Sequence, residues 1–370
     1  MTDPSYAALD AALERLAPFG PDLRNGLSNH APMAVEALCA LGRGDAAMGW
    51  LDRYGADLAP RPPRHARIAP ADWRSALGRP ERCEDWSALF AEELAEAPWR
   101  EVAARWLARL APAVCASATH GVIRVGHAVH ALAEADTAPR RRELADAFAS
   151  WTSAWQVLPE ARGAEPAVPR RRASEALGAV ARVPEAERRF RGTIVASLED
   201  LGAFAPFAGA IDLFDASAPP EEALSDLTET FARVYLANAD DLLHTIVFVH
   251  GVTGVAALRP LVPLVSPDVA RSLVRYGWQS SAALYAAFGR RAPSPAAPEG
   301  PRGDADELIE RAIENGDEHA IKLAAACLEE NRIRPAPAYL AAAWHAVSSL
   351  PPLRKAESGR PLWSTFHASA

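Results

Sequence analysis

Apolar residues recur every three or four positions through most of this chain, which is the spacing of one buried helix face. The segment 6–16 shows this spacing at Tyr6, Leu9, Leu13 and Leu16. Further helical segments are predicted at 31–41, 86–95, 99–110, 114–132, 143–157, 226–249, 266–288, 306–315, 318–331 and 336–348. Strand signals are weak, because β-branched runs are few and the most strand-like run, 246–249, also suits a buried helix. The pattern predicts an all-α fold.

Two proline-rich segments interrupt the helical pattern. Residues 159–172 combine proline, arginine and glycine, and residues 290–303 contain four prolines, so both are predicted loops. A chain of 370 residues is long enough for two domains. No repeat of fixed period is present, so a solenoid is disfavoured. We expect residues 1–370 to form one compact helical domain that carries these two loops.

Charge and cysteine usage narrow the class of protein. A net charge of -8 and a pI near 5.7 disfavour a nucleic-acid partner, because phosphate-binding surfaces are normally basic. The four cysteines are far apart and form no CxxC pair, so free thiols in a reducing cytoplasm are expected. The chain shows no signal-peptide pattern and no uninterrupted apolar run of about 18 residues, so no membrane span is expected.

Lys322 is one of only two lysines and lies in an alanine-rich helical segment. A buried ammonium is unfavourable unless it is paired, deprotonated or modified. His319 precedes it by three residues, so both side chains leave one helix face. A neutral lysine reacts with carbon dioxide to give a carbamate, which is an oxygen donor for a metal. The alternative is a lysine whose stem lies on alanines and whose ammonium reaches water, and spacing alone slightly favours that alternative.

Seven of the ten histidines occupy four short apolar settings, whereas His65, His345 and His367 lie elsewhere. The seven are His30, His120, His127, His130, His244, His250 and His319. Helix geometry separates His120 from His127 by roughly 10 Å along the axis, so both can bind one ion only if the helix is kinked at Gly121 or Gly126. The simpler expectation is that one binds a metal and the other holds a ligand or substrate by a hydrogen bond. Three or four histidines with one oxygen donor suit iron or manganese.

A second pair on one predicted helix, His244 and His250, is subject to the same restriction, because the two are six residues apart. His250 is followed by Gly251, which is predicted to break the apolar run. We therefore expect the imidazole of His250 to project from a helix end.

Five short motifs together resemble the questin oxidase-like family. They are Asn29–Met33, His120–Arg124 with His127, His250–Thr253, Tyr276–Gln279 with Tyr285, and His319–Leu323. They are spread over residues 25 to 330. The resemblance implies oxidative ring opening of anthraquinone-type aromatic polyketides, a reaction of secondary metabolism.

The family resemblance implies two alternative chemistries. One is a metal-free Baeyer–Villiger type of oxygenase that uses NADPH, and the other is a non-haem iron oxygenase with histidines and a carboxylated lysine at the metal. The chain has no GxGxxG motif after a strand, so no motif supports NADPH. It also lacks the usual HxD/E…H facial triad of iron oxygenases. The expected cofactor is Fe(II), with O2 and a small aromatic molecule as substrates.

The resemblance also assigns residues. The implied metal ligands are His30, His120, His250, His319 and carboxylated Lys322. His127 is the alternative ligand or a catalytic group, with His244 behind it as a ligand. Arg124 is expected to orient a substrate oxyanion or, equally, to form a buried salt bridge. Trp278 and Tyr285 line an aromatic pocket or belong to the core.

Three functions remain open from the sequence. The first is an iron-dependent dioxygenase that cleaves a ring carbon–carbon bond. The second is a metal-free oxygenase or pathway helper in which the histidines act as acid–base groups. The third is a non-catalytic helical protein that binds aromatic ligands.

Overall fold

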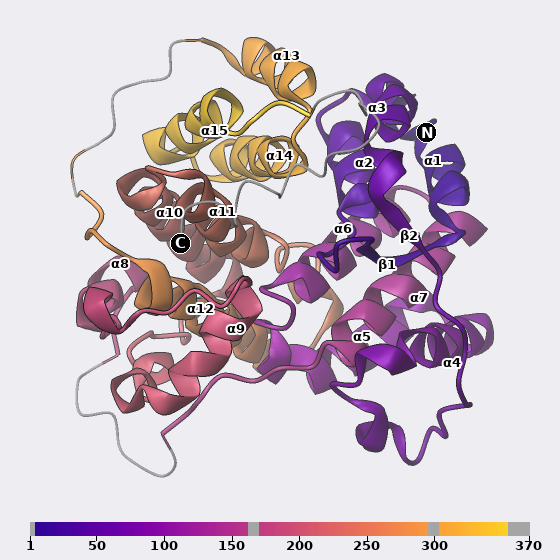
Figure 1. Ribbon diagram of the computed structural model, residues 1–370, viewed down its shortest axis with the longest axis horizontal. Coiled ribbons are helices and arrows are strands. Elements are labelled where there is room, and N and C mark those ends of the chain that lie inside the picture. Colours follow the sequence, from indigo (N-terminus) through magenta and orange to yellow (C-terminus); the bar gives the residue numbers. More distant parts are fainter. Residues whose placement is uncertain (1–3, 162–169, 295, 297–302, 354–370) are drawn as a thin grey trace.

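The computed structural model describes residues 4–161, 170–294, 296 and 303–353. Within them the only sheet is an antiparallel pair, β1 (Phe19–Leu23) and β2 (Leu58–Pro60), and the rest of the regular structure is helical (Figure 1). The α-helices are α1 (Leu9–Leu16), α2 (Ala31–Ala40), α3 (Ala47–Tyr54), α4 (Cys83–Glu96), α5 (Trp99–Leu110), α6 (His120–Glu134), α7 (Ala138–Ser153), α8 (Ala173–Ala176), α9 (Ile194–Asp200), α10 (Pro220–Asn238), α11 (Leu242–Ala256), α12 (Pro267–Phe288), α13 (Ala305–Asn315), α14 (Glu318–Ile333) and α15 (Pro337–Ser349). The predicted all-α fold is confirmed.

Several predictions about individual elements are wrong. The helix predicted at 143–157 is α7, which begins at Ala138 and ends at Ser153, and α3, α8 and α9 were not predicted. Residues 226–249 are not one helix, because α10 ends at Asn238 and Asp241 caps α11 by accepting the backbone N–H of His244. The apolar segment 114–132 becomes α-helical only at His120. The short β1–β2 strand pair was not expected, since its strands contain proline and glycine and carry little strand propensity, and α2 and α3 lie between them in the sequence.

The strand-like run 246–249 lies inside α11, where every residue from His244 to Val255 is buried. A helix that is buried on all sides needs no polar face, so its sequence loses the three-to-four periodicity. The same burial explains why a β-branched run forms a helix here. It also means that α11 crosses the interior of the molecule.

The two predicted loops lie partly outside the described residues. Their described ends, 159–161 and 170–172 in one and 290–294, 296 and 303 in the other, contain no helix. None of the four cysteines forms a disulfide, and all four are buried. Among the described helices no single one is long and apolar enough to cross a membrane, although the bent pair Ile194–Ala203 and Ala205–Asp212 meets that test by length and composition.

Four helices pack into a closed ring, which we call the four-helix ring. α2 contacts α6 and α14, and α11 contacts the same two helices. Figure 1 shows how this joins the N-terminal part of the chain, α1–α7, to the C-terminal part, α10–α15. Two apolar clusters meet at α2, which gives Met33 to the larger one and Ala31 and Ala34 to the smaller one. The ring therefore lies where the two halves of the core join.

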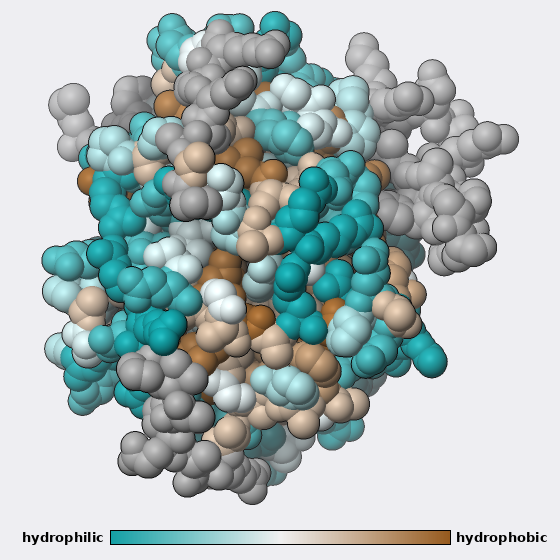
Figure 2. Space-filling view, turned by 90° about the vertical axis from the view of Figure 1, so that its left-hand side faces the viewer, coloured by the Kyte–Doolittle hydropathy of each residue, from teal (hydrophilic) through white to brown (hydrophobic). Residues whose placement is uncertain are grey.

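The surface is largely polar. Seen from the side of α10 and α15, hydrophobic residues form a broken band between hydrophilic ones (Figure 2). Among the described residues, the large apolar side chains that are clearly exposed are Val157, Phe190 and Ile333. Most of the apolar positions that give the sequence its periodicity are therefore buried in the core.

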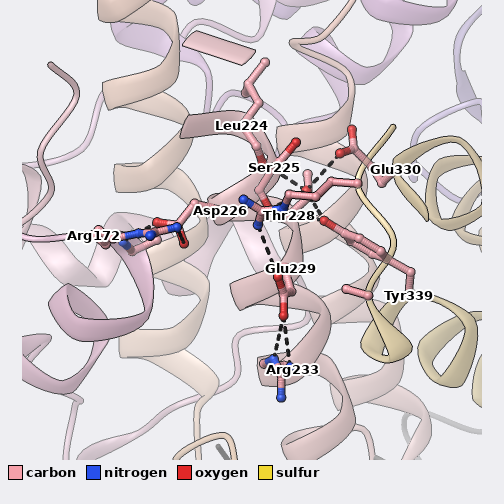
Figure 3. A network of polar contacts seen from close by, with 12 residues as sticks. Arg172, Leu224, Ser225, Asp226, Thr228, Glu229, Arg233, Glu330 and Tyr339 are labelled. Carbon is pink, nitrogen blue, oxygen red and sulfur yellow. Dashed lines mark hydrogen bonds and ion pairs between the residues drawn. The ribbon is translucent and has the colours of Figure 1, made fainter. Parts of the chain in front are cut away.

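A buried carboxylate fastens the C-terminal helices to one another. Glu330 of α14 is 1 % exposed, and both of its oxygens lie 2.7 Å from guanidinium nitrogens of Arg259, which follows α11. The Thr228 hydroxyl of α10 lies 3.1 Å from Glu330 Oε2 and 2.8 Å from the Tyr339 hydroxyl of α15 (Figure 3). The network satisfies the charge of Glu330 fully.

We expect Glu330→Gln to lower the free energy of unfolding by about 3 kcal/mol, because it leaves the Arg259 cation without its partner in a low-dielectric setting. Urea unfolding measures the change. The matched control is Glu329→Gln, since the adjacent Glu329 makes an exposed ion pair with Arg332; its effect should stay below about 0.5 kcal/mol. Equal losses in the two variants would contradict the role of the network.

Candidate metal centre

Each helix of the four-helix ring contributes one imidazole to a common point. His30 directly precedes α2, His120 opens α6, His250 lies in the middle of α11, and His319 lies in the first turn of α14. Neighbouring ring centroids are 4.6 Å apart for His30–His120 and for His120–His250, 5.4 Å for His250–His319 and 4.7 Å for His30–His319. The four imidazoles therefore form a closed quadrilateral.

The hydrogen bonds of two of these rings fix their tautomers. His120 Nδ1 lies 2.5 Å from the carbonyl oxygen of Ser117, and His250 Nδ1 lies 2.7 Å from that of Ile246. A carbonyl oxygen only accepts, so both Nδ1 atoms carry the proton and both Nε2 atoms carry a lone pair. Yet the two Nε2 atoms lie 3.1 Å apart. Two lone pairs at this distance repel each other unless a cation lies between them.

Protonation does not resolve this conflict. Burial, with the nearby Lys322, lowers the pKa of His120 to about 3. Burial, with the neighbouring histidines, holds the pKa of His250 well below its usual range. Both imidazoles are therefore neutral near pH 7. A metal ion satisfies the same geometry, because metal-bound histidines commonly donate the other ring N–H to a backbone carbonyl.

Lys322 completes the cluster from the next turn of α14. It is 2 % exposed, and its Nζ lies 3.0 Å from His30 Nδ1. Among the described residues no carboxylate lies within ion-pair distance of this nitrogen. Burial, only partly opposed by Glu318, lowers the pKa of the amine to about 8, against an ordinary value of 10.5. An appreciable fraction of Lys322 is therefore a neutral amine at neutral pH.

The sequence did not reveal Glu318 as part of this cluster. It is 8 % exposed, and its Oε1 lies 3.8 Å from His30 Nδ1 and 3.7 Å from His319 Nδ1. His30, Glu318 and His319 each offer a ligand atom within 4.8 Å of the others. His319 Nδ1 is buried without a hydrogen-bond partner among the described residues. Its position directly before His319 in the sequence was the one signal that could have identified Glu318 as a member of the cluster.

The predicted helix end at His250 is wrong. α11 continues through Gly251 to Ala256, and the imidazole reaches the cluster because the whole helix crosses the interior. His244, the weaker candidate ligand, lies at the start of the same helix. Its Nδ1 is held by Asp241 at 2.8 Å, away from the four imidazoles.

Arg124 forms the buried salt bridge that was one of its two predicted roles. Its Nε and Nη2 atoms bind the two oxygens of Glu143 at 2.6 and 2.9 Å. Trp278 is fully buried, stacks on Phe214 and donates its N–H to a backbone carbonyl, so it packs as a core residue. Tyr285 is 4 % exposed and also belongs to the core.

His127 belongs to a second polar cluster, which is centred on Glu36 of α2. Glu36 is 3 % exposed; its oxygens lie 2.5 Å from His127 Nδ1 and 2.7 Å from His130 Nδ1, and the Tyr6 hydroxyl donates to it at 2.6 Å. Burial raises the pKa of this carboxyl, but the charge of His130 and the two imidazole hydrogen bonds outweigh burial and hold the pKa below its usual range. His127 is therefore oriented by a carboxylate, and the four-imidazole cluster lies elsewhere.

The Glu36 cluster predicts a pH-dependent stability. The Glu36 charge and its hydrogen bond raise the pKa of His130 from 6.5 to about 9. The stabilisation is therefore complete below pH 6.5 and is lost as the pH rises through 9. His130→Gln should be less stable than the parent protein at pH 6 by about 1 kcal/mol, since solvent screens this half-exposed side chain, and the difference should vanish above pH 9.

Urea unfolding from pH 6 to 10 tests this expectation. The control is His65→Gln, which changes an exposed histidine outside both clusters and should leave the stability profile unchanged. A stability difference between parent and His130→Gln that did not vary with pH would show that the ion pair is not its source.

Comparison with known proteins shows the family of the chain. No curated protein matches this chain. A model of the questin oxidase-like family matches residues 27–327, which is most of the chain and includes the four clustered histidines and Lys322. This family indicates an oxidoreductase of the oxygenase type that acts on polyketides. The chain therefore belongs to the questin oxidase-like family.

Proposed function

We propose that this protein is a non-haem iron oxygenase that uses O2 to cleave a ring carbon–carbon bond of an anthraquinone-like polyketide. The proposed ligands are His30, His120, His250, His319 and carboxylated Lys322. The supporting observation is the pair of facing lone pairs on His120 Nε2 and His250 Nε2, 3.1 Å apart in a buried setting. A nitrogen-rich donor set with one oxygen suits a mid-row transition metal.

Lys322 is proposed to supply the oxygen donor. The ammonium first loses one proton to solvent; the neutral amine then attacks carbon dioxide, a nitrogen–carbon bond forms as one carbon–oxygen π bond breaks, and a second proton leaves to solvent, which gives a carbamate anion. Burial favours this reaction, because it removes the energetic advantage of the ammonium. The absence of a carboxylate within ion-pair distance of Nζ, among the described residues, supports an anionic rather than a cationic group at this point.

Iron, when bound, would supply the one-electron and O2 chemistry. The residues of this chain would hold it and keep water away. His30, His250, His319 and Lys322 are each 5 % exposed or less. Together with His120 of α6, they come from the four packed helices of the ring, so the positions of the proposed ligands are fixed before any substrate arrives. The electron-rich ring of a polycyclic phenol or its quinol would lie against this cluster.

Glu318 provides a second candidate for the oxygen ligand. Its carboxylate lies near His30 and His319, and burial raises its pKa. A metal that binds Glu318 would leave Lys322 as a hydrogen-bonding neighbour. The rival NADPH mechanism has little support, because the one sheet among the described residues is a pair of antiparallel strands, which provides no βαβ unit for a dinucleotide.

Lys322→Arg separates these possibilities. It keeps a positive charge but cannot form the carbamate, so iron content after anaerobic loading should fall at least tenfold. Lys355→Arg, which changes the only other lysine, is the matched control and should retain the metal. If Glu318→Gln loses iron while Lys322→Arg keeps it, the oxygen ligand is Glu318.

Carbon-13 NMR tests the carbamate itself. Protein equilibrated with labelled bicarbonate should show one carbamate signal in the parent and in Lys355→Arg, and none in Lys322→Arg. The same samples, loaded with iron and given a polycyclic quinol, should consume O2 only where the signal is present. If the parent protein contains less than stoichiometric metal after loading, the proposed function is overturned.

A further inference from the structure

The backbone that leads into α6 is left-handed over three consecutive residues. Ser117, Ala118 and Thr119 have φ values of 51°, 53° and 72°. Residues with a side chain avoid this region, and a β-branched threonine suits it least. Ala118 and Thr119 are 3 % and 1 % exposed. Such strain persists only where the surrounding structure holds it in place.

The turn places its own carbonyl group beneath the imidazole of His120. The Ser117 oxygen accepts the backbone N–H of His120 at 3.1 Å and lies 2.5 Å from its Nδ1. An ordinary helix start has an extended N-cap residue whose side chain accepts a backbone N–H. Here the N-cap, Thr119, is left-handed and makes no such bond. The Ser117 hydroxyl also lies 3.3 Å from that of Ser28, two residues before His30.

The turn is held between two helices. On one side, a Cβ added at Gly254 of α11 would lie 2.9 Å from Thr119 Cβ, so the two backbones approach closely. The Thr119 hydroxyl lies 3.5 Å from the carbonyl oxygen of His250. On the other side, a Cβ at Gly121 would lie 2.7 Å from the ring of Trp151. The position of His120 relative to α11 therefore depends on the contact between Thr119 and Gly254.

We propose that the turn Ser117–Thr119 is a positioning element of the cluster: it holds His120 in its Nδ1–H tautomer and directs the Nε2 lone pair toward His30 and His250. The role of the turn in metal binding rests on the proposed function. Its effect on the tautomer of His120 does not, because that effect exists in the metal-free protein. A turn that only joined two elements would need neither the bond to His120 nor three strained residues packed on α11.

The strain is tested by removing it. Ala118→Gly and Ala116→Gly each delete one buried methyl group, but only Ala118 has a positive φ. Both substitutions should raise the unfolding equilibrium constant of the metal-free protein. The increase for Ala118→Gly should be smaller than that for Ala116→Gly by a factor of about ten, because the glycine also relieves the backbone strain. Equal effects in urea unfolding would show that the backbone is not strained and would overturn this part of the proposal.

The positioning role is tested from the side of α11. Gly254→Ala pushes Thr119 away, whereas the control Gly251→Ala adds a Cβ at ordinary distances of 3.8 and 3.9 Å from Leu284 and Phe231. Long-range proton–nitrogen NMR of metal-free protein should show the Nδ1–H tautomer of His120 in the parent and in Gly251→Ala, and a mixture of tautomers in Gly254→Ala. An unchanged tautomer in Gly254→Ala would overturn the proposal.

Binding of Co2+, followed by its visible absorption, gives the second measurement. The affinity should fall at least tenfold in Gly254→Ala and stay at the parent value in Gly251→Ala. If Gly254→Ala binds Co2+ as tightly as the parent, the turn does not position the ligand. If the parent binds neither Co2+ nor Fe2+, the proposed function fails, and the tautomer result still decides whether the turn positions His120.

Discussion

Two neutral imidazoles that direct lone pairs at each other in a protein interior repel, and a cation between them removes that repulsion. His120 and His250 are in this situation, because the Nδ1–H of each donates a hydrogen bond to a backbone carbonyl, which leaves the lone pair on Nε2. Burial lowers the pKa of both imidazoles, so neither is protonated near pH 7. Much of the architecture serves to hold this unfavourable arrangement: a helix buried on all sides, a strained turn, and glycines where backbones must approach closely.

The buried charges of the molecule follow a rule to which this cluster is the exception. Glu36 is met by two imidazoles and a phenol, Glu143 by Arg124 and Glu330 by Arg259. Each carboxylate therefore has its countercharge within hydrogen-bond distance. Among the residues that the structure describes, the hydrogen-bonding partner of Lys322 Nζ is the ring nitrogen of His30 alone. The polar groups at the centre of the four-helix ring, which are the imidazoles and the Lys322 amine, therefore have no carboxylate partner of this kind in the described part of the chain.

The sequence predicted the helical class and most helix boundaries, because the apolar spacing and the proline breaks are local signals. The five residues that meet at the cluster were named together from the resemblance rather than from spacing. Helix geometry correctly kept His120 and His127 apart, and the structure gives the reason: His127 is bound to Glu36. That partner lies 91 residues away in sequence, so no local pattern announces it.

Other features had no readable signal. The left-handed turn contains serine, alanine and threonine, whose local preferences oppose it, so only tertiary packing selects it. His250 was expected at a helix end because Gly251 follows it, yet burial on all sides carries α11 through the glycine. The break before α11 comes from the Asp241 cap, which the apolar periodicity does not encode.

The contact between His30 and Lys322 joins residues that are 292 positions apart. During synthesis His30 emerges early, while Lys322 emerges only when most of the chain has been made. The intervening helices must dock before the imidazoles meet, and contacts of such long sequence separation form late. Assembly of the cluster is thus coupled to completion of the fold, so a chain truncated before α14 contains some of the clustered histidines but not the full set.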